Sequence, residues 1–379
     1  PLLNEKSDAV TVMSYGFDPY LSSWSPYHGA MYAIVTSLSK IVAVGGDYNK
    51  VHFTFQEYFR RMTSEATWGE PLAALLGAYE AQMRLGLASI GGKDSMSGTF
   101  NDINVPPTLV SFAVAVGENQ NIISTELKKA GNKLYLLRVK RDKYNLPDFE
   151  YLKKLYEYVQ KEIKAENIVS AFVTERNGCV EAISKMCFGN MLGANLSADE
   201  DTLFAPEFGS FLVECENELD FADAIYLGEV TDKPKLVVGG SEISLDEVLE
   251  SWKKPLEKVF PSVQEPDNKE CVEDKIYKAD SIYIAKEKYP TPRVFIPVMP
   301  GTNCEYDSIR AFNRAGAVAE AFVFRNSSPL AIKESVEKYR DEIRNSQIIM
   351  FPGGFSAGDE PDGSAKFFAT VFRNEILKK

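Results

Sequence analysis

The sequence predicts an α/β domain, an α+β domain and the beginning of a second α/β domain, in that order. Three observations support this prediction. Strand and helix signals alternate over residues 7–116, a polar, turn-rich stretch begins near residue 118, and strict alternation resumes after a Pro-rich, charged segment at 261–292. The chain has 379 residues, too many for one compact core, so we expect domains at 1–117, 118–260 and 293–379, with 261–292 as a linker.

The first domain is predicted to have the order βαβαββ, with both helices on one side of the sheet. Ser25 and Pro26 form a typical helix start, and Gly86 is a typical helix end. β-Branched or apolar runs predict the strands, and apolar residues every three or four positions predict the helices. The strands are expected at 8–15, 51–55 and 107–117, and the helices at 27–41 and 68–86, with LASI leading into a Gly-rich segment.

The two later domains follow from the same signals. In the second domain we expect strands at 134–139, 167–174, 208–216 and 225–231, and helices at 147–165, within 175–193, and at 244–260, the last capped by Ser244. In the third domain we expect strands at 293–299, 317–324 and 347–354, alternating with helices at 308–316, 330–345 and 362–376. Such alternation predicts a parallel sheet that binds ligands at the carboxyl ends of its strands.

Charge and cysteine content exclude several classes of protein. With 54 acidic and 42 basic residues, the formal net charge is −12, which does not favour binding to nucleic acid. The five cysteines form no CxxC pair, so neither a disulfide framework nor a zinc site is expected. No apolar run reaches the roughly 18 residues of a membrane helix, and no signal-like segment is present, so we expect no membrane association and a cytoplasmic location.

Residues 91–98, GGKDSMSG, are the first candidate binding segment. The glycines allow close approach of a ligand, Lys93 supplies a positive charge, Asp94 could hold Mg²⁺, and Ser95 and Ser97 offer hydroxyls. The segment is not a Walker A loop, because Asp follows the Lys and the earlier Gly is missing. The spacing fits a phosphate site and a simple turn with solvated charges equally well.

PGGFSAGDE, at residues 352–360, is the second candidate segment. Gly353 and Gly354 could aim successive N–H groups at one point, as in an oxyanion hole, although a plain βα turn gives the same pattern. Cys304 lies where a strand gives way to a helix, a setting that suits a nucleophile. A thiol nucleophile needs a base, and His28 and His52 are both in the first domain, so a Cys packed at the turn is expected instead.

Three segments together resemble one family. ASIGGKDSMSGTF, IPVMPGTNCEYDSIRAFNRAG and IMFPGGFSAGDE, in this order and spacing, are similar to the long, single-chain form of phosphoribosylformylglycinamidine synthase of purine biosynthesis. The resemblance implies an aminoimidazole ribonucleotide synthetase-like two-domain unit, here the second copy, followed by a truncated flavodoxin-like class I glutaminase domain. It also implies that the N-terminal synthetase half and the remainder of the glutaminase domain lie outside this chain, which would be inactive alone.

The resemblance implies an ATP-dependent C–N ligase with glutamine amidotransferase activity. ATP would activate the amide oxygen of formylglycinamide ribonucleotide, and ammonia from glutamine would displace the phosphate. The products would be formylglycinamidine ribonucleotide, glutamate, ADP and phosphate, with Mg²⁺ offsetting the developing charge. Two alternatives stay open: another member of the aminoimidazole ribonucleotide or selenophosphate synthetase superfamily, and a scaffold whose degenerate nucleotide site is not catalytic.

Site residues can be assigned from the resemblance position by position. In shorter members the matching loop contacts ATP through a Gly, Mg²⁺ through an Asn and the substrate through a Ser, which align with Gly92, Lys93 and Ser95. Because Lys replaces the Asn, Lys93 would meet phosphate and Asp94 would be the metal ligand. An acidic ATP ligand of the preceding strand would fall near Gln56 or Glu57.

The resemblance also assigns roles to the glutaminase part. Gly353 and Gly354 would donate to the tetrahedral oxyanion, and the reactive Cys would follow Lys379. Cys304 would then support the glutamine site without attacking the substrate.

The long form has an auxiliary nucleotide site, which is degenerate in this sequence. The matching stretch FVTERNG, at 172–178, lacks both aspartates of the family's turn, and Thr36 lies near a position usually held by Glu. We therefore do not expect a structural ADP to bind in the usual way.

Overall fold

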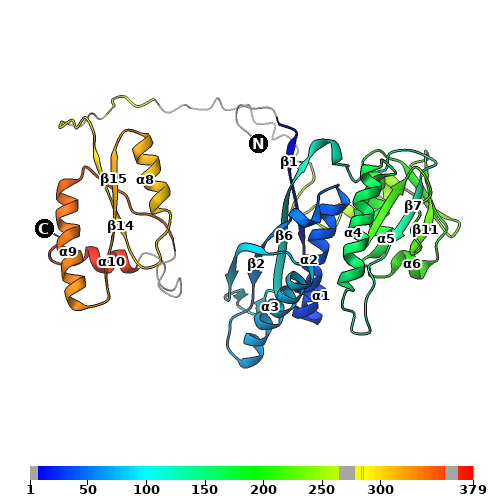
Figure 1. Cartoon of the computed structure of the whole chain (residues 1–379), viewed down its shortest axis with the longest axis horizontal. Helices are drawn as coiled ribbons and strands as arrows, with labels where there is room; N and C mark the ends of the chain where they lie inside the picture. The colour runs from blue at the N-terminus through cyan, green and yellow to red at the C-terminus, as the bar shows by residue number, and fades with distance from the viewer. Residues whose placement is uncertain (1–6, 264–277, 283, 285, 355–365, 379) are drawn as a thin grey trace. The chain divides into compact units, whose positions relative to one another are not determined.

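The computed structural model describes residues 7–263, 278–282, 284, 286–354 and 366–378. The chain divides into two compact units, unit 1 at residues 1–266 and unit 2 at residues 267–379 (Figure 1). Within the described ranges, no helix is both long and apolar enough to cross a bilayer. The finer division of unit 1 at residues 117 and 118 stays a prediction.

The first sheet of unit 1 has four strands in the order β1-β6-β2-β3. β1 (Ala9–Gly16) and β2 (His52–Tyr58) pair antiparallel with β6 (Thr108–Glu118), and β3 (Ser89–Ser95) runs parallel to β2. A short hairpin of β4 (Thr99–Phe100) and β5 (Ile103–Asn104) precedes β6. The long strands lie where the apolar runs predicted them, with bounds shifted by one residue, except that β2 extends three residues beyond its predicted end.

Helices α1 (Pro19–Trp24), α2 (Pro26–Ala43) and α3 (Glu65–Leu85) belong to this sheet, with a single 3₁₀ turn, η1 (Tyr48–Lys50), before β2. Ser25 caps α2, as predicted. Most of α2 is buried, because it packs against the first sheet on one side and against the second half of unit 1 on the other. α3 begins three residues before the predicted start, since Ser64 and Thr67 form a capping box there.

The second sheet of unit 1 has seven strands in the order β13-β12-β9-β11-β7-β10-β8. Its strands are β7 (Lys133–Leu137), β8 (Ile168–Val173), β9 (Gly193–Leu196), β10 (Phe211–Cys215), β11 (Ala224–Thr231), β12 (Lys235–Val238) and β13 (Ser241–Ser244). Its helices are α4 (Phe149–Lys164), α5 (Gly178–Phe188), α6 (Glu200–Phe204) and α7 (Leu245–Lys253), after a 3₁₀ turn, η2 (Asn119–Asn121). Only β12 and β9 pair in parallel. The predicted α+β character is confirmed, but β9, β12 and β13 were not predicted, and α7 ends earlier than expected.

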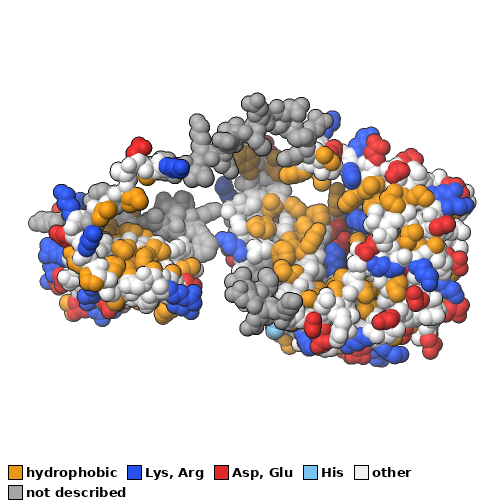
Figure 2. Space-filling model, turned by 90° about the horizontal axis from the view of Figure 1, so that it is seen from above, with side chains coloured by type: hydrophobic (Ala, Val, Ile, Leu, Met, Phe, Trp, Pro, Cys, Tyr) orange, Lys and Arg blue, Asp and Glu red, His pale blue; other side chains and the backbone are white. Residues whose placement is uncertain are grey.

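The two sheets of unit 1 share one core. Tyr156 of α4 is completely buried, and its hydroxyl lies 3.0 Å from Ser39 Oγ on α2. Ser39 Oγ in turn donates to the carbonyl of Gly209 at 2.8 Å. A single hydrophobic cluster runs from Val12 on β1 to Cys215 on β10. Outside this core, the space-filling view shows hydrophobic side chains between charged ones on the surface (Figure 2).

Unit 2 is a parallel sheet in which β14 (Arg293–Val298) lies between β15 (Val318–Val323) and β16 (Ile348–Ile349). The side chain of Ile296 packs toward α8 (Glu305–Arg314), and that of Phe295 packs toward α9 (Pro329–Asn345) and α10 (Lys366–Phe372). The predicted alternation is confirmed. α8 begins three residues earlier than predicted, and β16 is shorter than the predicted strand.

Candidate functional site

The pairing of β2 with β3 brings the candidate synthetase residues together. In this parallel register Gln56 lies opposite Lys93, Glu57 opposite Asp94, and Tyr58 opposite Ser95. Residues directly opposite one another on neighbouring strands point to the same face of a sheet, and successive residues point to opposite faces. Glu57 and Asp94 therefore share the face covered by helices, whereas Lys93 and Ser95 point to the other face.

The segment GGKDS is an edge strand and not the Gly-rich loop that the sequence suggested. The prediction was wrong because two adjacent glycines are also compatible with extended backbone, and hydrogen bonding to β2 selects that conformation. A Cβ at Gly92 would lie 2.2 Å from the carbonyl oxygen of Phe55, whereas one at Gly91 would meet nothing within 4 Å. The close approach of β2 is thus sufficient reason for glycine at position 92.

Glu57 and Asp94 form a pair of carboxylates near the carboxyl ends of two parallel strands. Glu57 is only 8% exposed, and burial, followed by the charge of Asp94, raises its pKa above the usual value. A bound divalent cation would stabilise the charged form of Glu57 and so offset both the cost of its burial and the repulsion by Asp94. Within the described parts of the chain, no group of three or more His, Cys, Asp or Glu is placed to hold a metal ion. A cation here would therefore take its other ligands from water or from phosphates, as Mg²⁺ commonly does.

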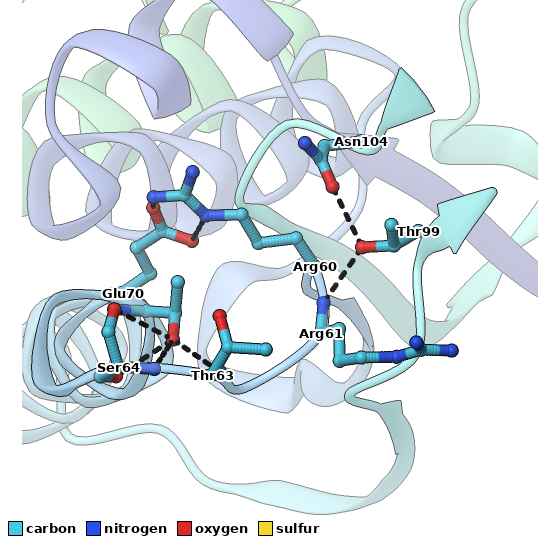
Figure 3. Close-up of polar contacts among 8 residues, drawn as sticks. Arg60, Arg61, Thr63, Ser64, Glu70, Thr99 and Asn104 are labelled. Carbon is cyan, nitrogen blue, oxygen red and sulfur yellow. Dashed lines mark hydrogen bonds and ion pairs between the residues drawn. The ribbon is translucent and has the colours of Figure 1, made fainter. Parts of the chain in front are cut away.

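The loop after β2 supplies two cations that the sequence analysis did not select (Figure 3). Arg60 Nε donates to Glu70 Oε2 at 3.1 Å, and a second, shorter bond joins the same side chains. The backbone N–H of Arg61 donates to Thr99 Oγ1 at 2.9 Å, and Thr99 donates to Asn104 Oδ1 at 2.7 Å. The Arg61 side chain is exposed next to these contacts (Figure 3). The sequence signal that could have identified these cations is the pair of adjacent arginines, Arg60 and Arg61, shortly after the strand.

The candidate oxyanion loop of unit 2 lies at the carboxyl ends of β14 and β16. The N–H of Asn303 donates to the Gly353 carbonyl at 3.0 Å, and Thr302 and Gly354 form an isolated bridge. Gly354 has a φ of +120°, and a Cβ there would lie 2.6 Å from the backbone nitrogen of Asn303. A side chain at position 354 would clash with Asn303, so the contact between the two loops requires glycine there. The rest of PGGFSAGDE, from residue 355, lies outside the described residues.

Cys304 is the residue before α8 and has a left-handed φ of +68°. Its thiol is exposed and lies 3.2 Å from Asn303 Oδ1, so it is not packed into the turn as expected. Left-handed backbone turns the side chain outward, which accounts for the difference. Both histidines of the chain belong to unit 1, so unit 2 has no imidazole of its own to act as a base.

Three other cysteines behave as core thiols. Cys179, Cys187 and Cys215 are buried and unpaired, as expected. Burial raises the pKa of Cys179 and of Cys187 to about 12, and it raises the pKa of Cys215 as well. These thiols are therefore protonated at neutral pH and are not candidate nucleophiles.

The residues that the resemblance aligns with an auxiliary nucleotide site lie close together inside unit 1. Thr36 and Glu175 line one enclosed cavity of about 10 Å³, which accommodates about one water molecule and no nucleotide. Lys40 Nζ donates to Glu175 Oε1 at 2.8 Å, and Arg176 Nε lies 3.4 Å from Asp18 Oδ2. These residues do not fit an ADP. The charged side chains already pair with one another, and the cavity between them is too small for a nucleotide.

Parts of the chain are similar to known proteins. Residues 291–379 match the CobB/CobQ-like glutamine amidotransferase domain family. The chain is 36% identical over 86 residues to phosphoribosylformylglycinamidine synthase subunit PurQ of Methanococcus maripaludis, covering 23% of this chain and 28% of that protein. It is 26% identical over 363 residues to a probable phosphoribosylformylglycinamidine synthase of Arabidopsis thaliana, covering 80% of this chain and 25% of that protein.

A solved structure has the same fold over most of the chain. T. maritima PurL complexed with FGAR superposes with a TM-score of 0.54 at 14% identity, covering 76% of this chain and 50% of that chain. By class, therefore, the chain shares the fold of T. maritima PurL over most of its length and is similar to an amidotransferase domain over residues 291–379. Both curated relatives described above are phosphoribosylformylglycinamidine synthases or subunits of one, and the chain is similar to them. The chain spans between 25% and 35% of the length of the curated relatives it matches.

Proposed function

We propose that this chain is part of an ATP-dependent ligase that makes formylglycinamidine ribonucleotide. The substrates would be formylglycinamide ribonucleotide, glutamine and ATP, and the other products glutamate, ADP and phosphate. The observation that carries the proposal is the union, in one chain, of the synthetase-like unit and the amidotransferase-type unit in the order of the relatives. In this scheme unit 1 takes part in amide activation, and unit 2 in the release of ammonia from glutamine.

In unit 1, Glu57 and Asp94 would hold Mg²⁺ together with the phosphates of ATP. The ion would neutralise charge that develops on the transferred phosphoryl group. Gly92 would let the phosphates approach the strand. The exposed guanidinium of Arg61, at the same edge of the sheet, would attract the nucleotide. The side chains of Lys93 and Ser95 point to the opposite face of the sheet, so they would contact the substrate or a neighbouring domain and not this ion.

In unit 2, Gly353 and Gly354 would donate backbone N–H groups to the oxyanion that forms when glutamine is attacked. Backbone donors suit this role because they are held in place before the reaction. Cys304 follows Asn303, whose N–H donates to the Gly353 carbonyl, and its unit has no imidazole. We propose that the reactive thiol lies outside this chain and that Cys304 supports the glutamine site. A Cys304→Ser variant of a full-length enzyme should then still form a glutamyl thioester.

Calorimetry with Mg²⁺-ATP tests the synthetase part. We expect measurable binding by the chain and at least a tenfold loss of affinity in Glu57→Gln and in Asp94→Asn. Asp47→Asn is the matched control, because Asp47 is a carboxylate of the same sheet region that instead caps η1 by accepting from Asn49 at 3.0 Å. Equal affinities in all four proteins would contradict the proposed metal site.

A non-catalytic scaffold is the second candidate. It is supported by the separation of Lys93 and Ser95 from Glu57 and Asp94 on two faces, and by the 10 Å³ cavity at the auxiliary site. No heat of binding at millimolar nucleotide would favour the scaffold and contradict ATP binding by this chain.

A further inference from the structure

The two adjacent arginines after β2 have different surroundings. The guanidinium of Arg60 makes two hydrogen bonds to the carboxylate of Glu70, which is only 17% exposed. This pair neutralises Arg60 and ties the loop to α3. The Arg61 guanidinium is exposed instead, and it makes no hydrogen bond or ion pair to any residue drawn in Figure 3. One of the two cations therefore has a structural partner, and the other is presented to solvent.

The backbone of Arg61 is held by the β4–β5 hairpin. Its N–H donates to Thr99 Oγ1 at 2.9 Å, and the Thr99 hydroxyl donates to Asn104 Oδ1 at 2.7 Å. Thr99 and Asn104 are directly opposite one another on the two strands of the hairpin. A hydroxyl has one proton to donate, so its bond to Asn104 leaves the Thr99 oxygen as the acceptor for Arg61. Both strands of the hairpin thus contribute to fixing this loop.

The base of the hairpin is anchored on the residue that follows β2. The N–H of Phe59 donates to the carbonyl of Ser95 at 2.9 Å, and the carbonyl of Phe59 accepts from Gly98 at 2.8 Å. Phe59 is completely buried. A Cβ at Gly98 would lie 2.3 Å from Val105 Cγ2 and 2.9 Å from the Phe59 oxygen, so hairpin and loop are in close contact. The segment that carries Arg61 is therefore held on both sides without a ligand.

We propose that the β4–β5 hairpin positions Arg61 to bind the phosphates of a nucleoside triphosphate, with Thr99 and Asn104 as positioning residues. This inference deepens the proposed function and rests on the nucleotide binding proposed there. A guanidinium presents a planar set of N–H donors that matches phosphate oxygens. A backbone that is already fixed has less conformational entropy to lose when the ligand binds.

The neighbouring carboxylates favour this class of anion. Arg61 is three residues beyond the end of β2, at the end of the sheet where Glu57 lies opposite Asp94. A simple carboxylate ligand would be repelled by these two side chains. A nucleotide brings a divalent cation with its phosphates, so it would satisfy the carboxylate pair and the guanidinium together.

Calorimetry of the whole 379-residue chain with Mg²⁺-ATP and with the Mg²⁺ complex of inorganic triphosphate tests the proposal. Arg61→Gln should lower the affinity for both ligands at least tenfold and by the same factor, because Arg61 contacts phosphates and not the base. The salt dependence of binding should also become weaker. Arg84→Gln is the control. It removes the same charge from a 65% exposed side chain roughly 28 Å away along α3, so the affinity should change less than about twofold.

Two substitutions at Thr99 separate positioning from folding. Thr99→Val removes the hydroxyl at nearly unchanged volume, so it should lower the affinity at least threefold and speed hydrogen exchange of the Arg61 amide. Thr99→Ser keeps a hydroxyl and should preserve both properties. In an Arg61→Gln background, Thr99→Val should cause no further loss of affinity, because the hydroxyl acts through Arg61. Circular dichroism of each variant checks that the fold is retained.

The outcomes distinguish this proposal from the proposed function. If the unsubstituted chain binds Mg²⁺-ATP and Arg61→Gln or Thr99→Val binds equally well, the role of the hairpin is refuted and nucleotide binding stands. The role of the hairpin is also refuted by a loss confined to ATP, or by an undiminished effect of Thr99→Val in the Arg61→Gln background. Failure of the unsubstituted chain to bind Mg²⁺-ATP would contradict the proposed function and this proposal with it.

Discussion

Replacement of Gly92 by Ala distinguishes a glycine required by the sheet from one required by a ligand. The added Cβ would lie 2.2 Å from Phe55 O and 3.1 Å from both the carbonyl carbon and the nitrogen of that residue. All three are backbone atoms of the central strand β2, so relief requires β3 to move away rather than a side chain to rotate. Overpacking of this kind costs about 2 kcal/mol. For a body the size of unit 1, that loss lowers Tm by about 4–8 °C.

The neighbouring Gly91 provides the matched control, because a Cβ there meets nothing within 4 Å. Gly91→Ala should leave the free energy of unfolding within about 0.5 kcal/mol of the starting protein or raise it slightly. Urea unfolding followed by circular dichroism measures both variants, and hydrogen exchange of the β3 amides shows whether the edge strand has separated. Equal stability of the two variants, with unchanged exchange in β3, would refute the packing argument and leave ligand approach as the reason for Gly92.

Three further outcomes follow from the site geometry. A double-mutant cycle of Lys40→Met and Glu175→Gln should give a coupling free energy of about 1 kcal/mol. This coupling should decrease at high salt, because both side chains are partly exposed. The absence of coupling at low salt would contradict the role of the ion pair beside the cavity. Since the pKa of Glu57 is raised in the folded state, the stability it contributes is present below its unfolded pKa and is lost as pH rises through its folded pKa. Urea unfolding between pH 4 and pH 8 should therefore show Glu57→Gln gaining stability relative to the starting protein as pH rises, and parallel pH profiles would contradict this. Cys304→Ser should lower the number of thiols that react rapidly with Ellman's reagent by one, because Cys304 is exposed; an unchanged number would show that its thiol is covered.

Several elements could be read directly from the sequence. α2 follows from Ser25 and Pro26 at its start and from apolar residues at helical spacing, and the alternation in unit 2 follows from short apolar runs that separate two amphipathic helices. The family was recognisable because three short segments occur in a fixed order. These signals are local, since each depends on residues a few positions apart.

Other features could not be read in this way. GGKDS has the composition of a loop and becomes a strand only because β2 offers it hydrogen bonds. β9 is four residues long and gains its stability from β11 and β12, which follow much later in the chain. The cations of the β2–α3 loop were missed because their placement depends on residues farther along the chain: Arg60 pairs with Glu70 of α3, and the N–H of Arg61 donates to Thr99.

Local signals in the sequence were enough to predict two modules in a recognisable order, their helices, most of their strands, and the residue types of the candidate sites. Folding, in contrast, places Glu57 opposite Asp94 while Lys93 points to the other face of the sheet, and it leaves between Thr36 and Glu175 a cavity of only about 10 Å³. This difference arises because propensity, capping and periodicity act between neighbours in the chain. Register, burial and the shift in the pKa of Glu57 instead depend on groups that only folding brings within a few ångströms of one another.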